Sequence, residues 1–210
     1  MAIYKGNKKV VAVYKGSTPI NKIYKGSTLV FQKSGGGGST HLFEGTATGN
    51  FDLKINNNQT IPITPDASGK WFYDTDEKIT NLSDFLFRQS AVTSVDLSNL
   101  DLTGISTNSM FNTCSNITSI KFNNTKSMKL TQVTSMFAGC TSLVSLDLSS
   151  FDVSNISKPW FIGNMFENCT SLSTIKCKQA FKDWCITNQD KIKLPSAMQE
   201  GGSGTWEIVD

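Results

Sequence analysis

The sequence predicts a mainly β fold in which strands alternate with short helical turns, an α/β solenoid with a small antiparallel β cap. The first observation is a Met-Phe-x-x-Cys segment that begins at Met110, Met136 and Met165, with steps of 26 and 29 residues. The second is a degenerate copy, FLFRQSAV over residues 85–92, which starts 25 residues before the first. The third is a short alternating run after each copy. Periods of this length predict coils that bury their apolar face only by stacking on the next coil.

The alternating runs predict short parallel strands that form one wall of the coils. They are Val95-Asp96-Leu97, Ile120-Lys121-Phe122, Leu146-Asp147-Leu148 and Ile175-Lys176-Cys177. Period-two alternation turns the first and third residues of each run inward and the middle residue outward. The pattern Met-Phe-x-x-Cys-x-x-Leu has apolar residues at i, i+1, i+4 and i+7, which predicts one or two helical turns on the opposite wall. The second half of each unit is rich in Ser, Asn and Asp, which predicts tight corners.

The repeated apolar residues form the predicted core. They are Met110, Phe111, Cys114, Met136, Phe137, Cys140, Met165, Phe166 and Cys169. Equivalent cysteines in successive coils predict an internal column of small buried side chains. A metal site is the alternative, but the C-x-x-C pairs and clustered histidines of zinc sites are absent from the sequence. Neighbouring coils lie about 4.8 Å apart, so distance allows disulfides, whereas a cytoplasmic origin disfavours them.

The repeats resemble the BspA-type leucine-rich repeats, an irregular family with the pattern mF-x-x-C-x-x-L-x-x-L-x-L-S. The resemblance covers residues 79–178, where three copies keep Met, Phe and Cys together. This family occurs in surface proteins of gut bacteria and in their phages. The resemblance implies a binding or display solenoid rather than an enzyme, and it leaves the ligand open because one fold hosts many functions.

The outward strand residues form a candidate binding face of small polar and mixed-charge side chains. Its charged members are Asp96, Lys121, Asp147 and Lys176. Such a face fits hydrogen bonding to a polysaccharide or a protein, and it fits an inert solvated sheet equally well. A second candidate is the inserted segment with Trp160 and Phe161, which accounts for the long 29-residue step. Because insertions in solenoids map to loops on one face, we expect a subunit contact or a recognition site there.

Residues 1–34 carry a different repeat, Tyr-Lys-Gly with a step of ten. The repeated positions are Tyr4 and Gly6, Tyr14 and Gly16, and Tyr24 and Gly26. Lys-Gly corners between strand-forming runs predict a series of short strands and tight turns. Such an array is too thin to bury a core alone, so we expect an anchor that needs a partner or copies of itself. The repeat resembles N-terminal segments of phage structural proteins, which implies contact with other virion proteins and a homo-oligomer, for which fibres suggest a trimer.

The charges are divided unevenly along the chain. Residues 1–34 contain seven lysines and no acidic residue, whereas the remainder has 13 basic and 17 acidic residues. A basic arm on a mildly acidic body is compatible with nucleic acid or an anionic protein surface. The arm has no arginine, however, and its lysines alternate with apolar residues, so we expect solvated strand faces and no nucleic acid.

A linker and an N-terminal cap separate the anchor from the repeats. Residues 35–40 are glycine-rich and predict a flexible linker. Residues 41–78 predict a small antiparallel β unit, with Pro62 on an edge strand and a third strand that contains Trp71. This unit would close the open end of the solenoid. Trp71 either packs in the core of the cap or stacks on a sugar.

The C-terminal segment, residues 179–210, predicts a second cap. Its helix covers residues 180–186, with Phe181, Trp184 and Cys185 on one face, and its final strand covers residues 205–209.

The sequence predicts no catalytic, metal-binding or cofactor-binding residue. His41 is the only histidine, and its sequence neighbours supply no convergent partners for a ligand or a base. Neither a G-x-S-x-G elbow nor a Walker loop is present. Carboxylate pairs among Asp96, Asp101, Asp147 and Asp152 are compatible in principle with glycan cleavage, but their repeated positions favour corners and strand faces.

The start of the chain lacks the apolar core of a signal peptide, and no run approaches the roughly 20 residues of a membrane span. We therefore expect synthesis in a host cytoplasm and no membrane insertion. Together with this, the two resemblances imply a final location in a virion and a non-enzymatic phage structural protein, a head or tail fibre or decoration protein that adheres to a host surface protein or polysaccharide. The alternatives are a bacterial cell-surface or secreted adhesin and an intracellular protein-interaction scaffold.

Overall fold

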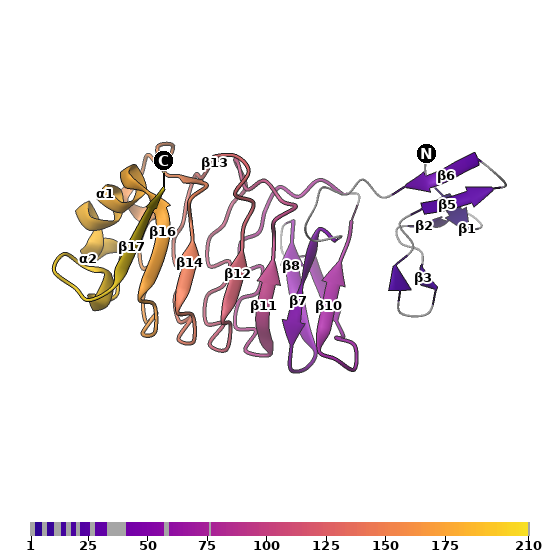
Figure 1. Ribbon diagram of the computed structural model, residues 1–210, viewed down its shortest axis with the longest axis horizontal. Helices are drawn as coiled ribbons and strands as arrows, with labels where there is room; N and C mark the ends of the chain where they lie inside the picture. The colour runs from indigo at the N-terminus through magenta and orange to yellow at the C-terminus, as the bar shows by residue number, and fades with distance from the viewer. Residues whose placement is uncertain are drawn as a thin grey trace.

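The computed structural model describes residues 41–56, 59–75 and 77–209, together with the backbone of six strands between residues 3 and 32. From residue 41 onward the chain is mainly β, and its strands lie side by side along the long axis of the molecule (Figure 1). The chain advances coil by coil from the N-terminal to the C-terminal end of this stack.

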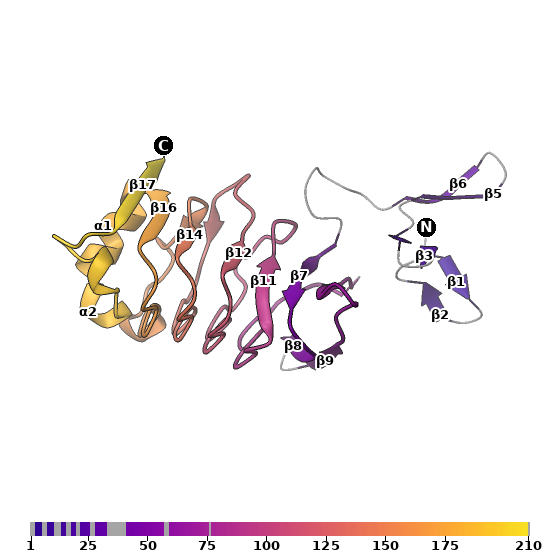
Figure 2. The same ribbon diagram turned by 60° about the horizontal axis from the view of Figure 1, so that its bottom comes forward.

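One wall of the stack consists of the predicted strands. β11 (Val92–Asp96) pairs in parallel with β12 (Ser119–Lys121), and β14 (Ser145–Asp147) pairs in parallel with β16 (Thr174–Lys178). The ladder is interrupted between β12 and β14, which nevertheless follow one another along the wall (Figure 2). The inward residues at the strand centres are buried, namely Val95, Ile120, Leu146 and Ile175. The parallel pairing and the inward residues are therefore as predicted, although the strands do not form one unbroken sheet.

A second, shorter wall follows the sheet. Two of its segments, β13 (Met128–Lys129) and β15 (Phe151–Asp152), pair in parallel with each other. Their first residues are buried, so this wall closes the core from a second side.

The corners after the strands are stabilised by side chains that bond their own backbone. The Oδ1 atom of Asp96 accepts the N–H of Ser98 at 2.8 Å, and Oδ1 of Asp147 accepts the N–H of Ser149 at 3.1 Å. The Oδ1 atoms of Asp101, Asn123 and Asp152 likewise accept the N–H of the residue two positions later. The prediction of tight Asp- and Asn-rich corners is confirmed.

The third wall, which we call the turn wall, is not helical, and the prediction of helical turns was wrong. The Met-Phe-x-x-Cys segments form consecutive turns, with a left-handed residue at every fourth position. These residues come in pairs, one pair in each coil: Asp84 and Arg88, Ser109 and Thr113, Ser135 and Gly139, and Asn164 and Asn168. The degenerate first copy has the same conformation as the other copies, which identifies it as a full coil.

Hydrogen bonding between coils explains this conformation. A helix would bond every N–H inside its own coil, four residues back. Here alternate N–H groups leave the coil instead, as when Phe111 donates to the carbonyl of Met136 at 2.9 Å and Thr113 donates to that of Ala138 at 2.6 Å. The N–H groups between them bond three residues back within the same turn. The left-handed residues thus direct alternate peptides toward the next coil, and buried backbone groups on this wall find partners.

The core between the walls contains an aromatic column. Phe111, Phe137 and Phe166 stack from coil to coil, with ring centroids 5.8 and 5.7 Å apart and interplanar angles of 6° and 10°. Each ring is completely buried. The repeated Met-Phe-x-x-Cys residues therefore occupy equivalent interior positions in successive coils.

The N-terminal cap closes both the sheet and the turn wall. β7 (Phe43–Ala47) is antiparallel to β11 on one side and to β10 (Lys70–Tyr73) on the other. β8 (Phe51–Ile55) and β9 (Gln59–Ile63) form an antiparallel hairpin against the turn wall. There the N–H of Lys54 donates to the carbonyl of Phe85 at 2.9 Å.

Two details of this cap bear on the predictions. Pro62 lies in β9, which among the described strands pairs with β8 alone and is thus an edge strand. Trp71 is 3% exposed and packs edge-on against Phe51, with centroids 5.0 Å apart. Trp71 is therefore part of the core, and burial removes it from any role in stacking on a sugar.

The C-terminal cap consists of helices and one further strand. α1 (Gln179–Thr187) covers the predicted helix, and α2 (Gln189–Ile192) and the 3-10 turn η2 (Ser196–Met198) follow it. β17 (Thr205–Val209) pairs in parallel with β16, so the cap also extends the sheet by one strand. Phe181 and Cys185 of α1 are buried, as predicted, while Trp184 is half-buried.

Three antiparallel hairpins precede the linker. β1 (Ile3–Lys5) pairs with β2 (Lys8–Val10), β3 (Tyr14–Lys15) with β4 (Thr18–Pro19), and β5 (Lys22–Lys25) with β6 (Thr28–Gln32). Tyr4, Tyr14 and Tyr24 belong to β1, β3 and β5, whereas Gly6, Gly16, Gly26 and the linker lie outside the described residues.

Candidate functional site

The outer side of the sheet carries a row of alternating charges. Register places Asp96 beside Lys121, and Asp147 beside Lys176. Lys121 Nζ lies 3.0 Å from Asp96 Oδ2, and Lys176 Nζ lies 3.1 Å from Asp147 Oδ2. The four predicted face residues therefore come together in one line, which we call the charged row.

Both carboxylates of the charged row are held in the ionised form. Burial acts to raise the pKa of Asp96, but hydrogen bonds from Ser98 and Lys121 outweigh it, so the pKa is lowered. The pKa of Asp147 is lowered in the same way, against the effect of burial, by bonds from Ser149 and Lys176. Exposed ion pairs contribute only about 0–1 kcal/mol each, so these pairs fix the pattern of charge more than they stabilise the fold.

The charged row is longer than the sequence predicted. Glu44 of β7 is in register with Asp96, and Glu207 of β17 is in register with Lys176. Glu44 was missed because no strand was predicted at residues 43–47. Glu207 was missed because its strand was assigned to a separate cap, although its position between Trp206 and Ile208 has the outward phase of a strand.

A row of hydroxyl groups runs beside the charged row, two residues before it in each parallel strand and two residues after it in the antiparallel strand β7. Its members are Thr46, Ser94, Ser119, Ser145, Thr174 and Thr205. At one end the hydroxyls of Thr46 and Ser94 lie 2.8 Å apart. The face thus repeats hydroxyl and charged groups at the spacing of neighbouring strands, about 4.8 Å.

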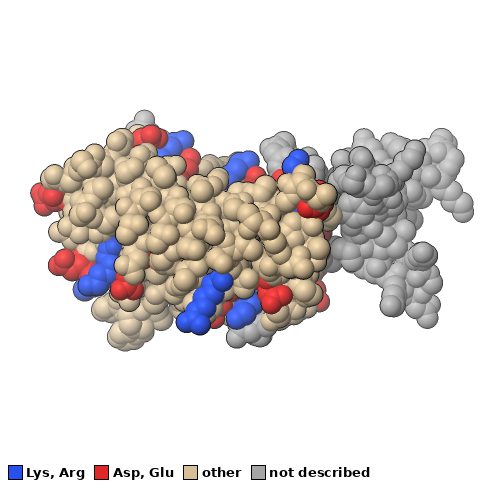
Figure 3. Space-filling model, turned by 90° about the horizontal axis from the view of Figure 1, so that it is seen from below, with Lys and Arg blue, Asp and Glu red and all other residues tan. Residues whose placement is uncertain are grey.

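The corner that leads into these strands is largely neutral. In the view from below, charged side chains lie toward the two long margins of the described surface, and its middle lacks them (Figure 3). Polar side chains at this corner donate hydrogen bonds to backbone carbonyls of the preceding coil. Nδ2 of Asn116 donates to the carbonyl of Ser90 at 2.9 Å, and the hydroxyl of Thr141 donates to the carbonyl of Ser115 at 3.1 Å. Charge on this side is therefore concentrated at the margins.

The inserted loop displays an aromatic ring at the surface. It contains the 3-10 turn η1 (Pro159–Phe161), in which Trp160 is 67% exposed and Phe161 is partly buried. The backbone of the loop is fixed, because Val133 donates its N–H to the carbonyl of Phe161 at 2.7 Å and the Thr134 hydroxyl donates to that of Trp160 at 2.9 Å. An exposed indole on a loop with a fixed backbone is suited to contact with another macromolecule.

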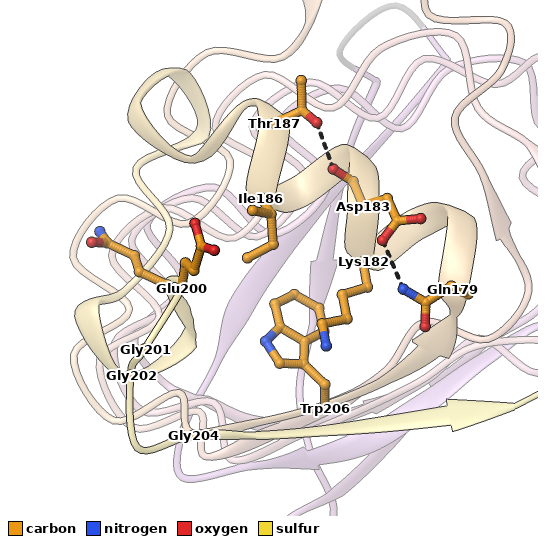
Figure 4. Close-up of a pocket in the computed structure, with 11 residues that line it drawn as sticks. Gln179, Lys182, Asp183, Ile186, Thr187, Glu200, Gly201, Gly202, Gly204 and Trp206 are labelled. Carbon is orange, nitrogen blue, oxygen red and sulfur yellow. Dashed lines mark hydrogen bonds between the residues drawn. The ribbon is translucent and has the colours of Figure 1, made fainter.

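A groove in the C-terminal cap was not predicted. It has a volume of about 540 Å³ and lies between α1 and residues 199–204. Trp206 of β17 forms its floor, and Lys182 reaches over the indole with Nζ 6.0 Å from the ring centroid (Figure 4). The signal in the sequence was the run of glycines before Trp206, which predicted only a turn.

His41 is held inside the N-terminal cap. Its Nδ1 atom lies 2.7 Å from Oδ2 of Asp74, and its ring stacks on Phe72 with centroids 4.0 Å apart. The amide of Asn99 donates to the carbonyl of His41 at 2.7 Å. These contacts join the start of the cap to the first coil, and they supply the partners that the local sequence did not reveal.

The stacked cysteines are free thiols inside the core. Cys140 donates to the carbonyl of Phe111 in the preceding coil at 3.2 Å, and Cys169 donates to that of Phe137 at 3.0 Å. Burial raises the pKa of the Cys114 and Cys169 thiols to about 12, so they stay protonated and unreactive at neutral pH. In the described part of the chain, no three His, Cys, Asp or Glu side chains are grouped to hold a metal ion.

The four aspartates considered for glycan cleavage have the wrong titration behaviour for a general acid. A bond from Lys126 is the largest of several effects that lower the pKa of Asp101 to about 2. The pKa of Asp152 is lowered as well, chiefly by Ser154. A glycosidase acid needs a raised pKa, and all four of these carboxyl groups have lowered ones. Their geometry is that of corners and ion pairs.

Residues 73–164 match the family model for the BspA type leucine-rich repeat region, with six copies. No curated protein and no solved structure matches the chain. None of the helices among the described residues is long and apolar enough to cross a bilayer. The match begins in β10 and ends one residue before Met165, so it covers most of the stacked coils.

Proposed function

We propose that this chain is a non-enzymatic adhesion protein in which a capped solenoid presents its outer sheet face to a bacterial cell surface. The BspA-type repeats in residues 73–164 support a surface, adhesion or protein-interaction role. The observation that carries the proposal is the charged row with its neighbouring hydroxyls. Such a face offers donors and acceptors at a fixed spacing, which suits a polar partner with repeating groups, a surface polysaccharide or a protein.

Charge reversal on the row tests this function. The double variant Lys121→Glu, Lys176→Glu replaces both cations of the row and should weaken binding of the labelled full-length protein to responsive bacterial cells at least about tenfold, a loss of about 1.4 kcal/mol. The reason is that four carboxylates would then lie together where two ion pairs lay before. Binding would be measured by flow cytometry on a panel of gut bacteria.

Lys126→Glu is the matched control for this experiment. Lys126 forms an ion pair with Asp101 at 2.9 Å, and its side chain is 60% exposed against 57% for Lys121, but it lies outside the charged row. The control variant should bind as the unchanged protein does. Equal binding by the double variant would reject the sheet face, and loss of binding in Trp160→Ala instead would favour a protein-interaction role through the inserted loop.

We also propose that residues 1–34 fasten this module to a phage particle, as part of a head or tail fibre or decoration protein. The ten-residue repeat and its three hairpins support the proposal, because hairpins this short need neighbours to be stable. The intended partners are other virion proteins and further copies of the same chain.

Light scattering on the full-length protein beside a chain that begins at Ser39 tests the anchor. The full-length chain should be a defined oligomer and the shortened chain a monomer, since the proposed contacts all lie in the removed segment. Two monomers would reject self-association through residues 1–34. If the full-length and the shortened chain form the same oligomer, the subunit contact lies in the repeats, and Trp160 is the first residue to replace.

A further inference from the structure

We infer that the groove between α1 and residues 199–204 binds one neutral hexopyranose ring, stacked on the indole of Trp206. The proposal uses no residue of the charged row, so it stands or falls separately from the adhesive face. It rests on the floor of the groove, on its two walls and on its charge.

The floor is an aromatic surface held in one orientation. Trp206 is half-buried, and its indole Nε1–H donates to the carbonyl of Met198 at 3.2 Å. The ring rises from β17 into the space between α1 and the glycine-rich segment (Figure 4). An indole fixed in this way offers an apolar surface on which a sugar ring can stack, while the flexible Lys182 side chain that lies over it turns toward the hydroxyls of the bound sugar.

One wall is polar and comes from α1. Gln179 Nε2 donates to Asp183 Oδ1 at 2.7 Å, which orients the carboxylate at the rim of the groove. Lys182 stands next to it on the same helix, close to the indole. The Asp183 carboxylate supplies hydrogen-bond acceptors and the Lys182 ammonium supplies donors at separate points of the groove, and a pyranose can use both, because each of its hydroxyls both donates and accepts.

The other wall is backbone that is already in place. A Cβ atom on Gly202 would lie 2.4 Å from the carbonyl oxygen of Ala197, and one on Gly204 would lie 2.5 Å from Sδ of Met198. Only glycine permits this close packing, so the segment from Glu200 to Gly204 is fixed against η2. The groove is therefore preformed, as sites for small ligands usually are.

The charge and composition of the groove distinguish a sugar from other ligands. Among the lining residues, Lys182 is the single cation and is outnumbered by two acids, Asp183 and Glu200, which disfavours phosphates and other anions. A cationic ligand at the indole would meet the like charge of the Lys182 ammonium, whose Nζ lies 6.0 Å from the ring centroid. Ile186 and Trp206 are the only large apolar side chains of the lining, too few to hold an apolar peptide anchor.

Titration of the ¹⁵N-labelled full-length protein with glucose, galactose, mannose and N-acetylglucosamine tests the inference. At least one sugar should shift the Trp206 indole N–H resonance in a saturable manner, with a dissociation constant of about 1–10 mM, as expected for a single ring. The indole resonances of Trp71, Trp160 and Trp184 should stay in place, because these rings do not line the groove.

Two variants and a control make the experiment decisive. Trp206→Leu, followed through the backbone amide resonances of Gly201 and Gly202 in the groove, should abolish the sugar-induced shifts seen there in the unchanged protein. Asp183→Asn, which keeps the shape of the side chain, should weaken sugar binding at least about threefold. Asp190→Asn, an exposed aspartate on α2 outside the groove, should leave it unchanged. The inference is overturned if no sugar shifts the Trp206 resonance, if Asp183→Asn binds as tightly as the unchanged protein, or if inorganic phosphate or trilysine binds more tightly than every sugar.

Discussion

Replacing Phe137 with alanine is expected to lower the free energy of unfolding by about 3–5 kcal/mol. The ring is completely buried and stacks between Phe111 in the preceding coil and Phe166 in the following coil. Truncation removes its own burial and both stacking partners, and each aromatic pair adds about 0.5–1.5 kcal/mol beyond burial. Because each coil is supported only by its neighbours, the cavity cannot be filled from elsewhere.

Urea unfolding followed by circular dichroism would measure this loss in the full-length chain. Trp160→Ala is the matched control, since it also removes an aromatic side chain, but one that is 67% exposed. The control should change the free energy of unfolding by no more than about 0.5 kcal/mol. Similar values for the two variants would show that the aromatic column does not support the stack.

Gly139→Ala is expected to lower the free energy of unfolding by about 2 kcal/mol or more. Gly139 has φ of +73°, where a side chain costs about 1–2 kcal/mol. In addition, an added Cβ would lie 3.1 Å from Cα and 3.3 Å from N of Thr113 in the preceding coil. The backbone of Thr113 is fixed by its own bond to Ala138, so relief of this contact would strain the bond between the coils.

Two other glycines separate the conformational cost from the contact. Gly104 has φ of +72° with open space at its Cβ, so Gly104→Ala should lose only about 1 kcal/mol. Gly163 has open space and no left-handed φ, so Gly163→Ala should be neutral or gain a few tenths of a kcal/mol. Chemical denaturation of the three variants should give this order, and a loss in Gly163→Ala as large as that in Gly139→Ala would contradict it.

The sheet wall was predictable because alternation of apolar and polar residues alone determines which side chains face inward. Alternation with a period of two identifies inward and outward residues wherever one face is buried, and Val95, Ile120, Leu146 and Ile175 follow it. The same alternation aligned Asp96, Lys121, Asp147 and Lys176. The ion pairs among these four residues follow from register, which places equivalent strand positions of successive coils side by side although the repeats differ in length.

The turn wall was not predictable from apolar spacing alone. Residues at i, i+4 and i+7 are inward-facing in a helix, and they are equally so in a run of turns with a left-handed residue every fourth position. The difference lies in where the backbone N–H groups bond, which involves the next coil. The residues at the left-handed positions, which include Ser109, Thr113 and Gly139, differ too much in type to signal the conformation.

The C-terminal groove was missed for a different reason. Its lining joins α1 to a strand more than twenty positions later in the chain, so no single window of sequence contains it. β7 was missed because the run from Phe43 to Ala47 includes Gly45 and lacks clear alternation. Gly45 is needed there, since a Cβ would lie 2.0 Å from the carbonyl oxygen of Ser94.

The direction of the hydrogen bonds on the turn wall gives the stack an electrical polarity. Between coils, every such N–H points toward the C-terminal end, as in the bonds from Leu86 to Met110, from Phe111 to Met136 and from Phe137 to Met165. The dipoles of the peptides that bond between coils therefore add up along the axis of the stack, as peptide dipoles do along a helix axis. The first coil therefore presents carbonyls, which accept N–H groups of β8, and the last presents N–H groups, which the carbonyls of Lys191 and Ile192 accept. The N-terminal cap therefore supplies N–H donors to the turn wall and the C-terminal cap supplies carbonyl acceptors. Whole coils can be added between the two caps, but neither cap can take the place of the other.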